Sequence, residues 1–354
     1  MKRDRTWILA GIALLIVIGV CLDLLWGGGQ RKSSGEEQQK DDGKIQIGIT
    51  FDSFILERWQ RDRDVFVAAA QELGAEVNIQ NANGDMQEQA DQIDYFIEKQ
   101  VDVIVLVMVA SDESTEGLKA EIAKAQEAGI PVVAYDRLVL DSDVDLYISF
   151  DNEEVGRLMA EHMKEHLDGK GKLLQICGPM ADYNVPQVMK GFSEVLDGTG
   201  LSIVQTDYAD GWIGEKGFAV TGEYLDSNTP PEGIMCGNDN IAGNAIRALS
   251  ERRLAGSICV VGQDADLDAC QRIVEGTQCM TVYKPVEKLA RRAAELAVEL
   301  ARRETIKVQE TISDGTFDVP YEKLTPVAVT RDNMDEIITG KYHEESDIYL
   351  NIRK

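Results

Sequence analysis

From Lys44 onward, short apolar runs alternate with amphipathic stretches of helical spacing. One run, 101–109, is almost entirely apolar, which is typical of a central strand in a parallel sheet covered by helices on both faces. The expected strands are 45–51, 75–79, 101–109, 132–135, 146–150, 173–177, 202–206, 233–236 and 258–262. The expected helices are 58–73, 87–99, 115–128, 155–167, 185–196, 215–225 and 242–249. This alternation predicts an α/β fold built on parallel sheets.

These units are too many for one sheet of ordinary size, so we expect two doubly wound lobes. In such sheets, ligands bind just beyond the carboxyl ends of the strands. Polar residues do follow the strand runs, namely Asp52, Asp136, Arg137, Asp182, Asn238, Asp239, Gln263 and Asp264. The sequence therefore predicts a polar ligand site at these strand ends.

Charge and composition exclude several classes of protein. The chain has 62 acidic against 36 basic residues and a formal net charge of -26, whereas nucleic-acid binders need a basic face. None of its cysteines forms a C-x-x-C pair, so no zinc site is expected. We interpret the cysteines as small buried hydrophobic residues and leave open one bridge, between Cys270 and Cys279. The pair His162 and His166 is interpreted as part of a solvated helix face.

Motifs for cofactors and catalysis are missing from the sequence. The turn after the first strand has no glycine and so cannot be a dinucleotide-binding loop, and no G-x-S-x-G nucleophile motif occurs. The acidic run 141–145 lacks the Gly and Glu that a calcium loop requires. We therefore expect no cofactor, no metal and no enzymatic activity. One remote alternative is a sugar-processing enzyme that uses Asp136, Asp182 or Asp264 as acid and base.

The remaining candidate residues are Asp, Asn, Arg, Lys and Trp, and this mixture suits a neutral ligand with many hydroxyl groups. Each hydroxyl both donates and accepts a hydrogen bond, and the C–H faces of a sugar ring stack on aromatic rings. Single positions also have plain structural interpretations. Asp264 could cap a helix, Arg58 could pair with Glu57 or Asp62 at the surface, and Trp59 could belong to the core.

The N-terminal segment has the features of a membrane anchor. Lys2, Arg3 and Arg5 precede an apolar stretch from Trp7 to Trp26, about 20 residues long, which as a helix would span roughly 30 Å of hydrocarbon. The basic start places the N-terminus in the cytoplasm and the body outside. Because no A-x-A-like cleavage site follows, we expect segment 1–26 to remain as an uncleaved transmembrane helix. Segment 27–43 has the composition of a flexible linker.

Six motifs resemble one family, in order and at matching spacing. They are LERWQ (56–60), AYDR (134–137), YISFDN (147–152), DGW (210–212), GQDADL (262–267) and MTVYKP (280–285). They are similar to the D-xylose-binding members of the ribose/galactose-type periplasmic sugar-binding proteins, and the similarity extends from about Lys44 to the last twenty residues. The resemblance implies a type I periplasmic binding protein fold, with two lobes joined by a three-strand hinge. It places 44–149 with 283–318 in the N-terminal lobe and 150–282 with 319–354 in the C-terminal lobe.

The resemblance also implies the ligand and its contacts. Two tryptophans sandwich the pyranose ring of D-xylose or a similar pentose, and the other residues bond its hydroxyls. The implied contacts are Arg58, Trp59, Asp136, Arg137, Asp182, Asn184, Trp212, Asn238, Asp264 and Lys284. Asp182 and Asn184 keep the Asp-x-Asn spacing of the family although the flanking residues differ.

The expected anchor sets this chain apart from the soluble members of the family. It leaves two functions open. In the first, which we favour from the sequence, the tethered protein senses xylose and signals to a membrane sensor histidine kinase. In the second, it delivers xylose to an ABC permease. Both place the sugar-binding body outside the cell membrane, on a single-pass anchor.

Overall fold

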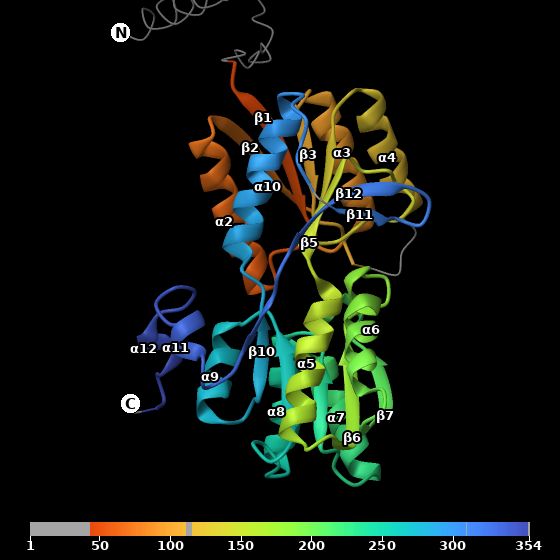
Figure 1. Ribbon diagram of the computed structural model, residues 1–354. Helices are drawn as coiled ribbons and strands as arrows, with labels where there is room; N and C mark the ends of the chain where they lie inside the picture. The colour runs from red at the N-terminus through yellow and green to blue at the C-terminus, as the bar shows by residue number, and fades with distance from the viewer. Residues whose placement is uncertain (1–42, 111–114, 309, 353–354) are drawn as a thin grey trace, which may run out of the picture. The chain divides into compact units, whose positions relative to one another are not determined.

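Two sheets carry the strands of the body, and helices connect most of these strands (Figure 1). The computed structural model describes residues 43–110, 115–308 and 310–352 of the 354. The expected anchor and nearly all of the expected linker lie outside these residues. Within the described part of the chain, no helix is both long and apolar enough to cross a membrane.

The first sheet has seven strands in the order β11-β12-β5-β4-β3-β1-β2. Its strands are β1 (Ile45–Phe51), β2 (Ala75–Asn81), β3 (Val103–Leu106), β4 (Val132–Tyr135), β5 (Leu146–Phe150), β11 (Glu310–Ser313) and β12 (Asp318–Leu324). All pair in parallel except β11, which runs antiparallel to β12. With helices α2 (Glu57–Glu72), α3 (Met86–Glu98), α4 (Glu116–Glu127) and α10 (Val286–Ala301), this sheet forms the N-terminal lobe.

The second sheet has six strands in the order β13-β10-β9-β8-β6-β7. Its strands are β6 (Lys170–Cys177), β7 (Gly200–Tyr208), β8 (Gly233–Cys236), β9 (Cys259–Gln263), β10 (Met280–Tyr283) and β13 (Val327–Val329), the last antiparallel to β10. With it lie α5 (Asn152–His166), α6 (Asn184–Leu196), the 3-10 turn η1 (Asp210–Trp212), α7 (Glu215–Ser227), α8 (Asp239–Glu251), α9 (Leu267–Glu275), α11 (Met334–Ile337) and α12 (Glu345–Ile348). Together they form the C-terminal lobe.

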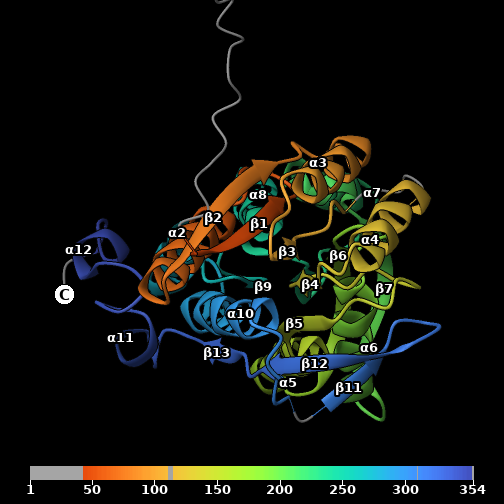
Figure 2. The same cartoon turned by 90° about the horizontal axis from the view of Figure 1, so that it is seen from above.

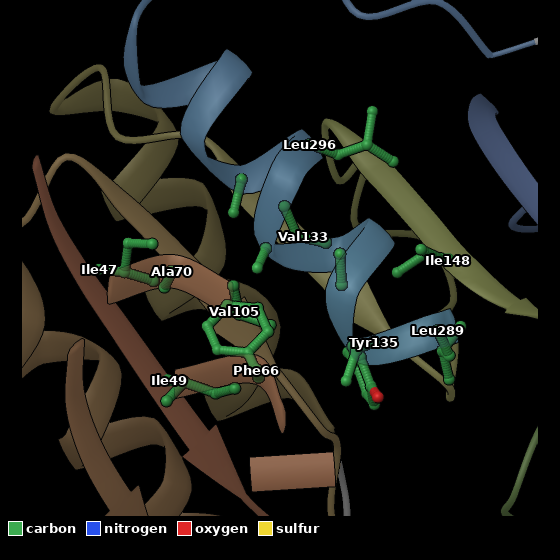
Figure 3. Close-up of a cluster of buried hydrophobic side chains, with 14 of the residues drawn as sticks. Ile47, Ile49, Phe66, Ala70, Val105, Val133, Tyr135, Ile148, Leu289 and Leu296 are labelled. Atoms are coloured by element: carbon green, nitrogen blue, oxygen red, sulfur yellow. The ribbon is translucent and has the colours of Figure 1, made fainter. Parts of the chain in front are cut away.

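Helices cover both faces of the first sheet, as the continuous apolar strands predict. On one face, Phe66 of α2 and Leu289 of α10 pack against Val105 and Val133 (Figure 3). On the other face α3 and α4 pack, and Figure 2 shows them across the strands from α10. The four residues of β3 are fully buried for this reason. The sequence predicted a longer strand, 101–109, because the apolar run continues past Leu106. Residues 107–109 are buried in the hydrophobic clusters of this lobe but lie outside the strand.

One expected lobe boundary is wrong. We placed residues 319–354 in the C-terminal lobe, but β12 pairs with β5 in the N-terminal lobe as far as Leu324. The Tyr321 hydroxyl secures this pairing by donating to the Phe150 carbonyl at 2.9 Å. The described chain thus passes between the lobes after β5, after β10 and between β12 and β13. The choice of a neighbouring strand depends on contacts far apart in the sequence, which local apolar patterns do not reveal.

Two glycines allow α5 and α6 to touch along the C-terminal lobe. A Cβ atom at Gly156 would lie 2.0 Å from the Val188 carbonyl oxygen, and one at Gly191 would lie 1.9 Å from the Glu153 carbonyl oxygen. Any side chain at either position would force the helices apart. This contact fixes α5, which begins directly at a crossing between the lobes.

Candidate functional site

A single pocket between the lobes gathers all ten residues that the sequence analysis singled out. It encloses about 340 Å³ of space, including solvent at its mouth. Arg58 and Trp59 come from the start of α2, Asp136 and Arg137 follow β4, and Lys284 follows β10. The residues contributed by the C-terminal lobe are Asp182, Asn184, Trp212, Asn238 and Asp264. They meet because the parallel strands of each lobe point their carboxyl ends at the other lobe.

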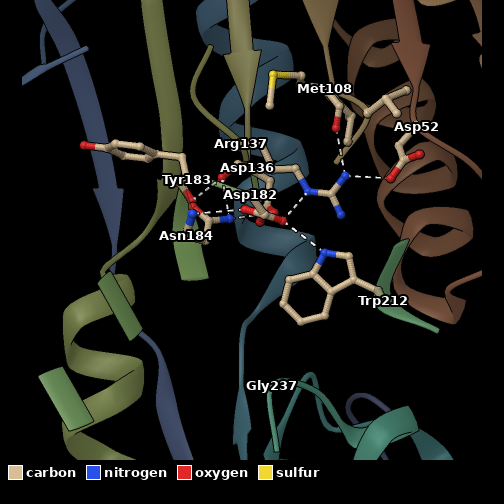
Figure 4. Close-up of polar contacts among 12 residues, drawn as sticks. Asp52, Met108, Asp136, Arg137, Asp182, Tyr183, Asn184, Trp212 and Gly237 are labelled. Atoms are coloured by element: carbon tan, nitrogen blue, oxygen red, sulfur yellow. Dashed lines mark hydrogen bonds and ion pairs between the residues drawn. The ribbon is translucent and has the colours of Figure 1, made fainter. Parts of the chain in front are cut away.

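The N-terminal lobe supplies a cluster of buried charges. Arg58 is 4% exposed, and its Nη2 atom lies 2.8 Å from Oδ1 of Asp136. A weaker partner, Asp62, lies 3.7 Å from the Arg58 Nε atom. The interpretation of Arg58 as part of a surface ion pair is therefore wrong, because Arg58 is buried. Asp62, one of the two partners that this interpretation named, does lie near it. Arg137 pairs with Asp52 at 2.6 Å, and its Nη1 atom also donates to the Met108 carbonyl at 2.8 Å (Figure 4).

Asp136 is held in a strained conformation by three hydrogen bonds. Its φ of 65° lies in the left-handed region, which costs a non-glycine residue free energy. The Asp136 carbonyl accepts hydrogen bonds from the hydroxyls of Tyr147 at 3.1 Å and Ser149 at 2.8 Å. A third donor, Nδ2 of Asn184, reaches it from the C-terminal lobe at 3.0 Å. The strained turn points the carboxylate at Arg58 and offers the carbonyl to the other lobe.

Charged pairs also join the two lobes directly, and Figure 4 shows Arg137 facing Asp182. Nε of Arg137 lies 2.8 Å from Oδ2 of Asp182. A second pair joins Arg58 Nη1 to Asp264 Oδ1 at 3.7 Å, and the latter atom also lies 2.7 Å from Nζ of Lys284. All five side chains are less than 10% exposed, so these pairs act with little screening by solvent. The lobes are in a closed arrangement in which each lobe neutralises charges of the other.

The Trp212 ring rests on the C-terminal lobe. Trp212 ends the turn η1 with a φ of 59°, directly after Gly211 with a φ of 61°. Its Nε1 atom donates to Oδ2 of Asp182 at 3.1 Å (Figure 4). The ring lies against Gly178, where an added Cβ atom would come within 2.4 Å of it. The half-buried ring is thus held by one hydrogen bond to Asp182 and by packing against the backbone at Gly178.

The Trp59 ring is set into the N-terminal lobe. It is 1% exposed and belongs to the hydrophobic cluster between the first sheet and α2, so the core interpretation of Trp59 is right in part. The guanidinium carbon of Arg58 lies 4.2 Å from the ring centroid, and that of Arg137 lies 5.4 Å away. Cations at these distances are attracted to the π-face of an indole. Trp59 therefore lies both in the core and at the wall of the pocket.

The charges around Asp136 decide its ionisation. Burial opposes the charged form, but Arg58, Lys284 and Arg137 outweigh this effect and lower the pKa of Asp136. Asp62 behaves differently. Burial raises the pKa of Asp62 to about 7, and Arg58 offsets only part of that rise. A hydrogen bond from the Tyr135 hydroxyl also reaches Asp62.

The two remaining residues from the C-terminal lobe have distinct local roles. Asn238 caps α8, since its Oδ1 atom accepts a hydrogen bond from the backbone N–H of Ile241 at 2.8 Å. Only its Nδ2 group is left to donate into the pocket. Asp264 does not cap a helix, because α9 begins later, after Asp266. Its φ of 100° turns it toward Lys284, so the capping interpretation of Asp264 is wrong.

Three residues of the pocket were not among the ten named contacts, although Gln263 was among the polar residues expected at the strand ends. Leu56 precedes α2, Asn152 begins α5, and Gln263 ends β9. Nδ2 of Asn152 donates to Oδ1 of Asn184 at 2.9 Å, and Nε2 of Gln263 donates to the Gly237 carbonyl at 2.5 Å. Leu56, Asn152 and Gln263 all stand inside motifs that the sequence analysis quoted. Membership of those motifs was the one sequence feature that could have marked the three residues as pocket residues.

Two of the buried polar atoms that line the pocket make neither a hydrogen bond nor an ion pair among the described residues. They are Nε1 of Trp59 and Oε1 of Gln263. Burying such atoms without partners costs free energy. A ligand with several hydroxyl groups could pair with donors and acceptors of this kind at once. The arrangement fits a small polyol or sugar better than an apolar ligand.

Comparisons with known proteins agree with this geometry. The model of the family described as "Periplasmic binding protein domain" matches residues 47–305. This chain belongs to that family. The resemblance inferred from the six motifs is thereby confirmed, and the two-lobed fold with it.

Two curated relatives are especially similar. The D-xylose-binding periplasmic protein of Haemophilus influenzae is 40% identical over 311 residues, which cover 86% of this chain and 92% of that protein. The D-xylose-binding periplasmic protein of Escherichia coli is 39% identical over 311 residues, covering 86% of this chain and 93% of that protein. Neither comparison addresses an anchored form of this chain.

A solved structure extends the comparison to the fold. An ABC transporter solute-binding protein from Clostridium phytofermentans, with bound β-D-glucose, aligns with a TM-score of 0.75 at 27% identity. The alignment covers 86% of this chain and 99% of the other. The two-lobed body of this chain therefore has the architecture of a solute-binding protein.

Proposed function

We propose that this chain binds D-xylose between its two lobes and acts outside the cytoplasm as the substrate-binding component of an ABC transporter. One observation carries the proposal. The ten residues expected to contact a pentose, which are far apart in the sequence, line one pocket between the lobes. The identity of about 40% to two proteins named for D-xylose supports the choice of sugar.

The chemistry of the pocket accounts for a preference for a pentose. Trp59 and Trp212 offer aromatic surfaces for the C–H faces of a pyranose ring, one from each lobe. A hexose carries an additional hydroxymethyl group, which rigid walls exclude by steric clash. Epimers would leave a buried carboxylate such as Asp264, or a guanidinium such as Arg58, with an unmet hydrogen bond, which penalises their binding.

Transport is better supported than sensing. The preference for sensing rested on the expected anchor, which lies outside the described residues. The relatives are named as periplasmic binding proteins, and the glucose-bound structure is named as a transporter component. Signalling through a histidine kinase has no support from these comparisons. We therefore adopt delivery to an ABC permease, the second of the two functions left open by the sequence.

The electrostatics of the pocket also argue against a glycosidase. Such an enzyme needs a carboxyl group that stays protonated until it donates to the leaving oxygen. The pKa of Asp136 is lowered, because Arg58, Lys284 and Arg137 together outweigh the effect of burial. Asp182 and Asp264 each lie within 3 Å of a cationic nitrogen, of Arg137 and Lys284 respectively. These carboxylates are placed to accept hydrogen bonds from hydroxyl groups.

Calorimetry with the purified protein tests the choice of sugar. We expect D-xylose to bind with one site per chain and a dissociation constant in the micromolar range or below. D-glucose, L-arabinose and D-ribose should bind at least about 100-fold more weakly, a difference of roughly 2.7 kcal/mol. Equal affinity for glucose and xylose would contradict the proposed pentose specificity while leaving a sugar-binding function intact.

Uptake of labelled xylose tests the choice of transport. Cells that carry the gene for this chain should lose high-affinity xylose uptake when it is deleted and regain it when it is restored. Co-purification from membranes with xylose present should recover a permease and its ATPase. Recovery of a sensor kinase instead, with unchanged uptake, would favour the sensing function.

A further inference from the structure

A second cluster of polar side chains lies at the opposite end of the C-terminal lobe from the sugar pocket. His162 and His166 stand one turn apart near the end of α5. Cys259 is the first residue of β9, and Cys279 directly precedes β10. Because parallel strands begin at one edge of a sheet and end at the other, these cysteines lie at the edge away from the pocket. Helix α5 runs back along β9 and β10 and brings its histidines to that edge (Figure 1).

The four side chains converge on one point. One ligand atom from each, a ring nitrogen or a sulfur, lies within 4.8 Å of every other. Sγ of Cys279 lies 3.9 Å from Nε2 of His166. A tetrahedral zinc ion with Zn–S bonds of about 2.3 Å and Zn–N bonds of about 2.0–2.1 Å separates its ligand atoms by roughly 3.3–3.8 Å. Small adjustments of side-chain rotamers therefore bring the cluster to the required geometry.

A further observation points to a ligand at this cluster. The Nε2 atom of His162 is buried and makes no hydrogen bond among the described residues. Cys259 and Cys279 form no disulfide in this structure, and neither do the other three described cysteines. A buried imidazole nitrogen beside two thiols is an arrangement that a metal ion satisfies fully.

We propose that His162, His166, Cys259 and Cys279 bind one zinc ion. Two thiolates and two neutral imidazoles are a donor set of structural zinc sites, and the two thiolates balance the charge of the ion. With all four positions filled by protein, the site has no opening for catalysis. It ties the end of α5 to the starts of β9 and β10 and so stabilises the C-terminal lobe. Its place at the far edge of the sheet leaves the sugar pocket untouched.

Competition with a zinc-binding chromophore tests the proposal on the reduced full-length protein. We expect one zinc ion per chain and an increase in the melting temperature when zinc is added. Cys279→Ser and His162→Gln should each weaken zinc binding by at least 100-fold. Cys270→Ser is the matched control, because Cys270 is a buried cysteine that forms no disulfide and lies outside the cluster. It should bind zinc like the parent protein, and D-xylose affinity should stay within about twofold in all of these variants.

Cobalt provides a readout that does not depend on the folding of variants. Co²⁺ bound to the parent protein should give the intense visible absorption of a tetrahedral ion and the sulfur-to-cobalt charge-transfer bands of thiolate ligands. Zinc should displace it in a ratio of one to one. Octahedral cobalt spectra, or zinc binding that Cys279→Ser leaves intact, would overturn the proposal. So would a disulfide between Cys259 and Cys279 in protein isolated from its native compartment.

Discussion

The two tryptophans of the pocket are held in different ways. Trp59 is a core residue of the N-terminal lobe, 1% exposed, with two guanidinium groups beside its ring. Its Nε1 atom has no hydrogen-bond partner in the part of the chain that the structure describes. Trp212 is half-buried at the end of a short 3-10 turn, and its Nε1 atom donates to Asp182. The first ring is fixed by packing, and the second is fixed by one hydrogen bond and the flat surface of Gly178.

This difference separates stability from binding. Trp59 belongs to the hydrophobic core, so replacing it lowers the stability of the fold. Trp212 lies at the surface of its lobe, so replacing it should affect stability much less. We therefore expect substitutions at Trp59 to affect both folding and sugar affinity. Substitutions at Trp212 should act mainly on affinity.

Trp59→Ala should have the largest effect. It leaves a cavity in the N-terminal lobe and should lower the free energy of unfolding by about 3–5 kcal/mol, with xylose binding lost below detection. Trp59→Phe should recover most of the stability, because Nε1 of Trp59 makes no hydrogen bond to any described residue that the substitution would remove. Urea denaturation and calorimetry measure the two effects. Full stability in Trp59→Ala would show that the ring is not a core element.

Trp212→Ala should abolish measurable xylose binding, a loss of at least about 100-fold or 2.7 kcal/mol, while lowering the free energy of unfolding by less than about 2 kcal/mol. Trp212→Phe keeps a ring but loses the hydrogen bond to Asp182, so it should bind with intermediate affinity. Calorimetry on both variants checks the order. Near-normal affinity in Trp212→Ala would rule out the aromatic sandwich.

Gly178→Ala should weaken xylose binding by about tenfold, or 1.4 kcal/mol. The new methyl group would lie 2.4 Å from the Trp212 ring and must push the ring toward the other lobe. Gly222→Ala is the matched control, since the nearest atom to its added methyl group, Nη2 of Arg252, lies 3.9 Å away. Tryptophan fluorescence and calorimetry should report a change only at Gly178. Equal effects of the two variants would contradict the role of Gly178 as the backing of the ring.

Asp62→Asn should change affinity least, by less than about threefold at pH 8, but it should alter the pH dependence of stability. Burial raises the pKa of Asp62 from 3.8 to about 7 in the folded protein. The folded state therefore binds more protons than the unfolded state between these values, and stability falls as pH rises through this window.

The Asn variant cannot titrate there, so its stability relative to the parent protein should increase from pH 5 to pH 8. The expected increase is on the order of 1–3 kcal/mol. Urea unfolding of both proteins at pH 5, 6, 7 and 8 measures it. A constant difference across this range would show that Asp62 is ionised throughout.

Local patterns predicted the elements of the fold well, and the exceptions have physical causes. The strands at 132–135, 146–150 and 233–236 coincide with β4, β5 and β8. Strand β3 is shorter than expected, because the apolar residues 107–109 are buried in the hydrophobic clusters of the lobe without being part of the strand. The assignment of 319–324 to a lobe was wrong because β12 chooses its partner β5 through long-range pairing.

The candidate site was predicted largely through its motifs. All ten named residues line the pocket, since the motifs lie at strand ends and the topology brings those ends together. Motifs did not indicate which residues pair across the lobes. The contact of Arg137 with Asp182 and that of Arg58 with Asp264 join the two lobes in this structure. Asn152 and Gln263 were left out of the ten named contacts, although Gln263 was expected at a strand end, because nothing in the sequence distinguishes a motif residue that faces the pocket from one that supports it.

The sequence by itself determined the alternation of strands and helices, the acidic charge and the residue types at the strand ends. These follow from periodicity and composition, which are local properties of the chain. Only the tertiary structure decided which distant residues meet. It made a core residue of Trp59, raised the pKa of Asp62, and placed His162 and His166 against Cys259 and Cys279. Burial and proximity depend on how strands pair and lobes close, and no short stretch of sequence contains that information.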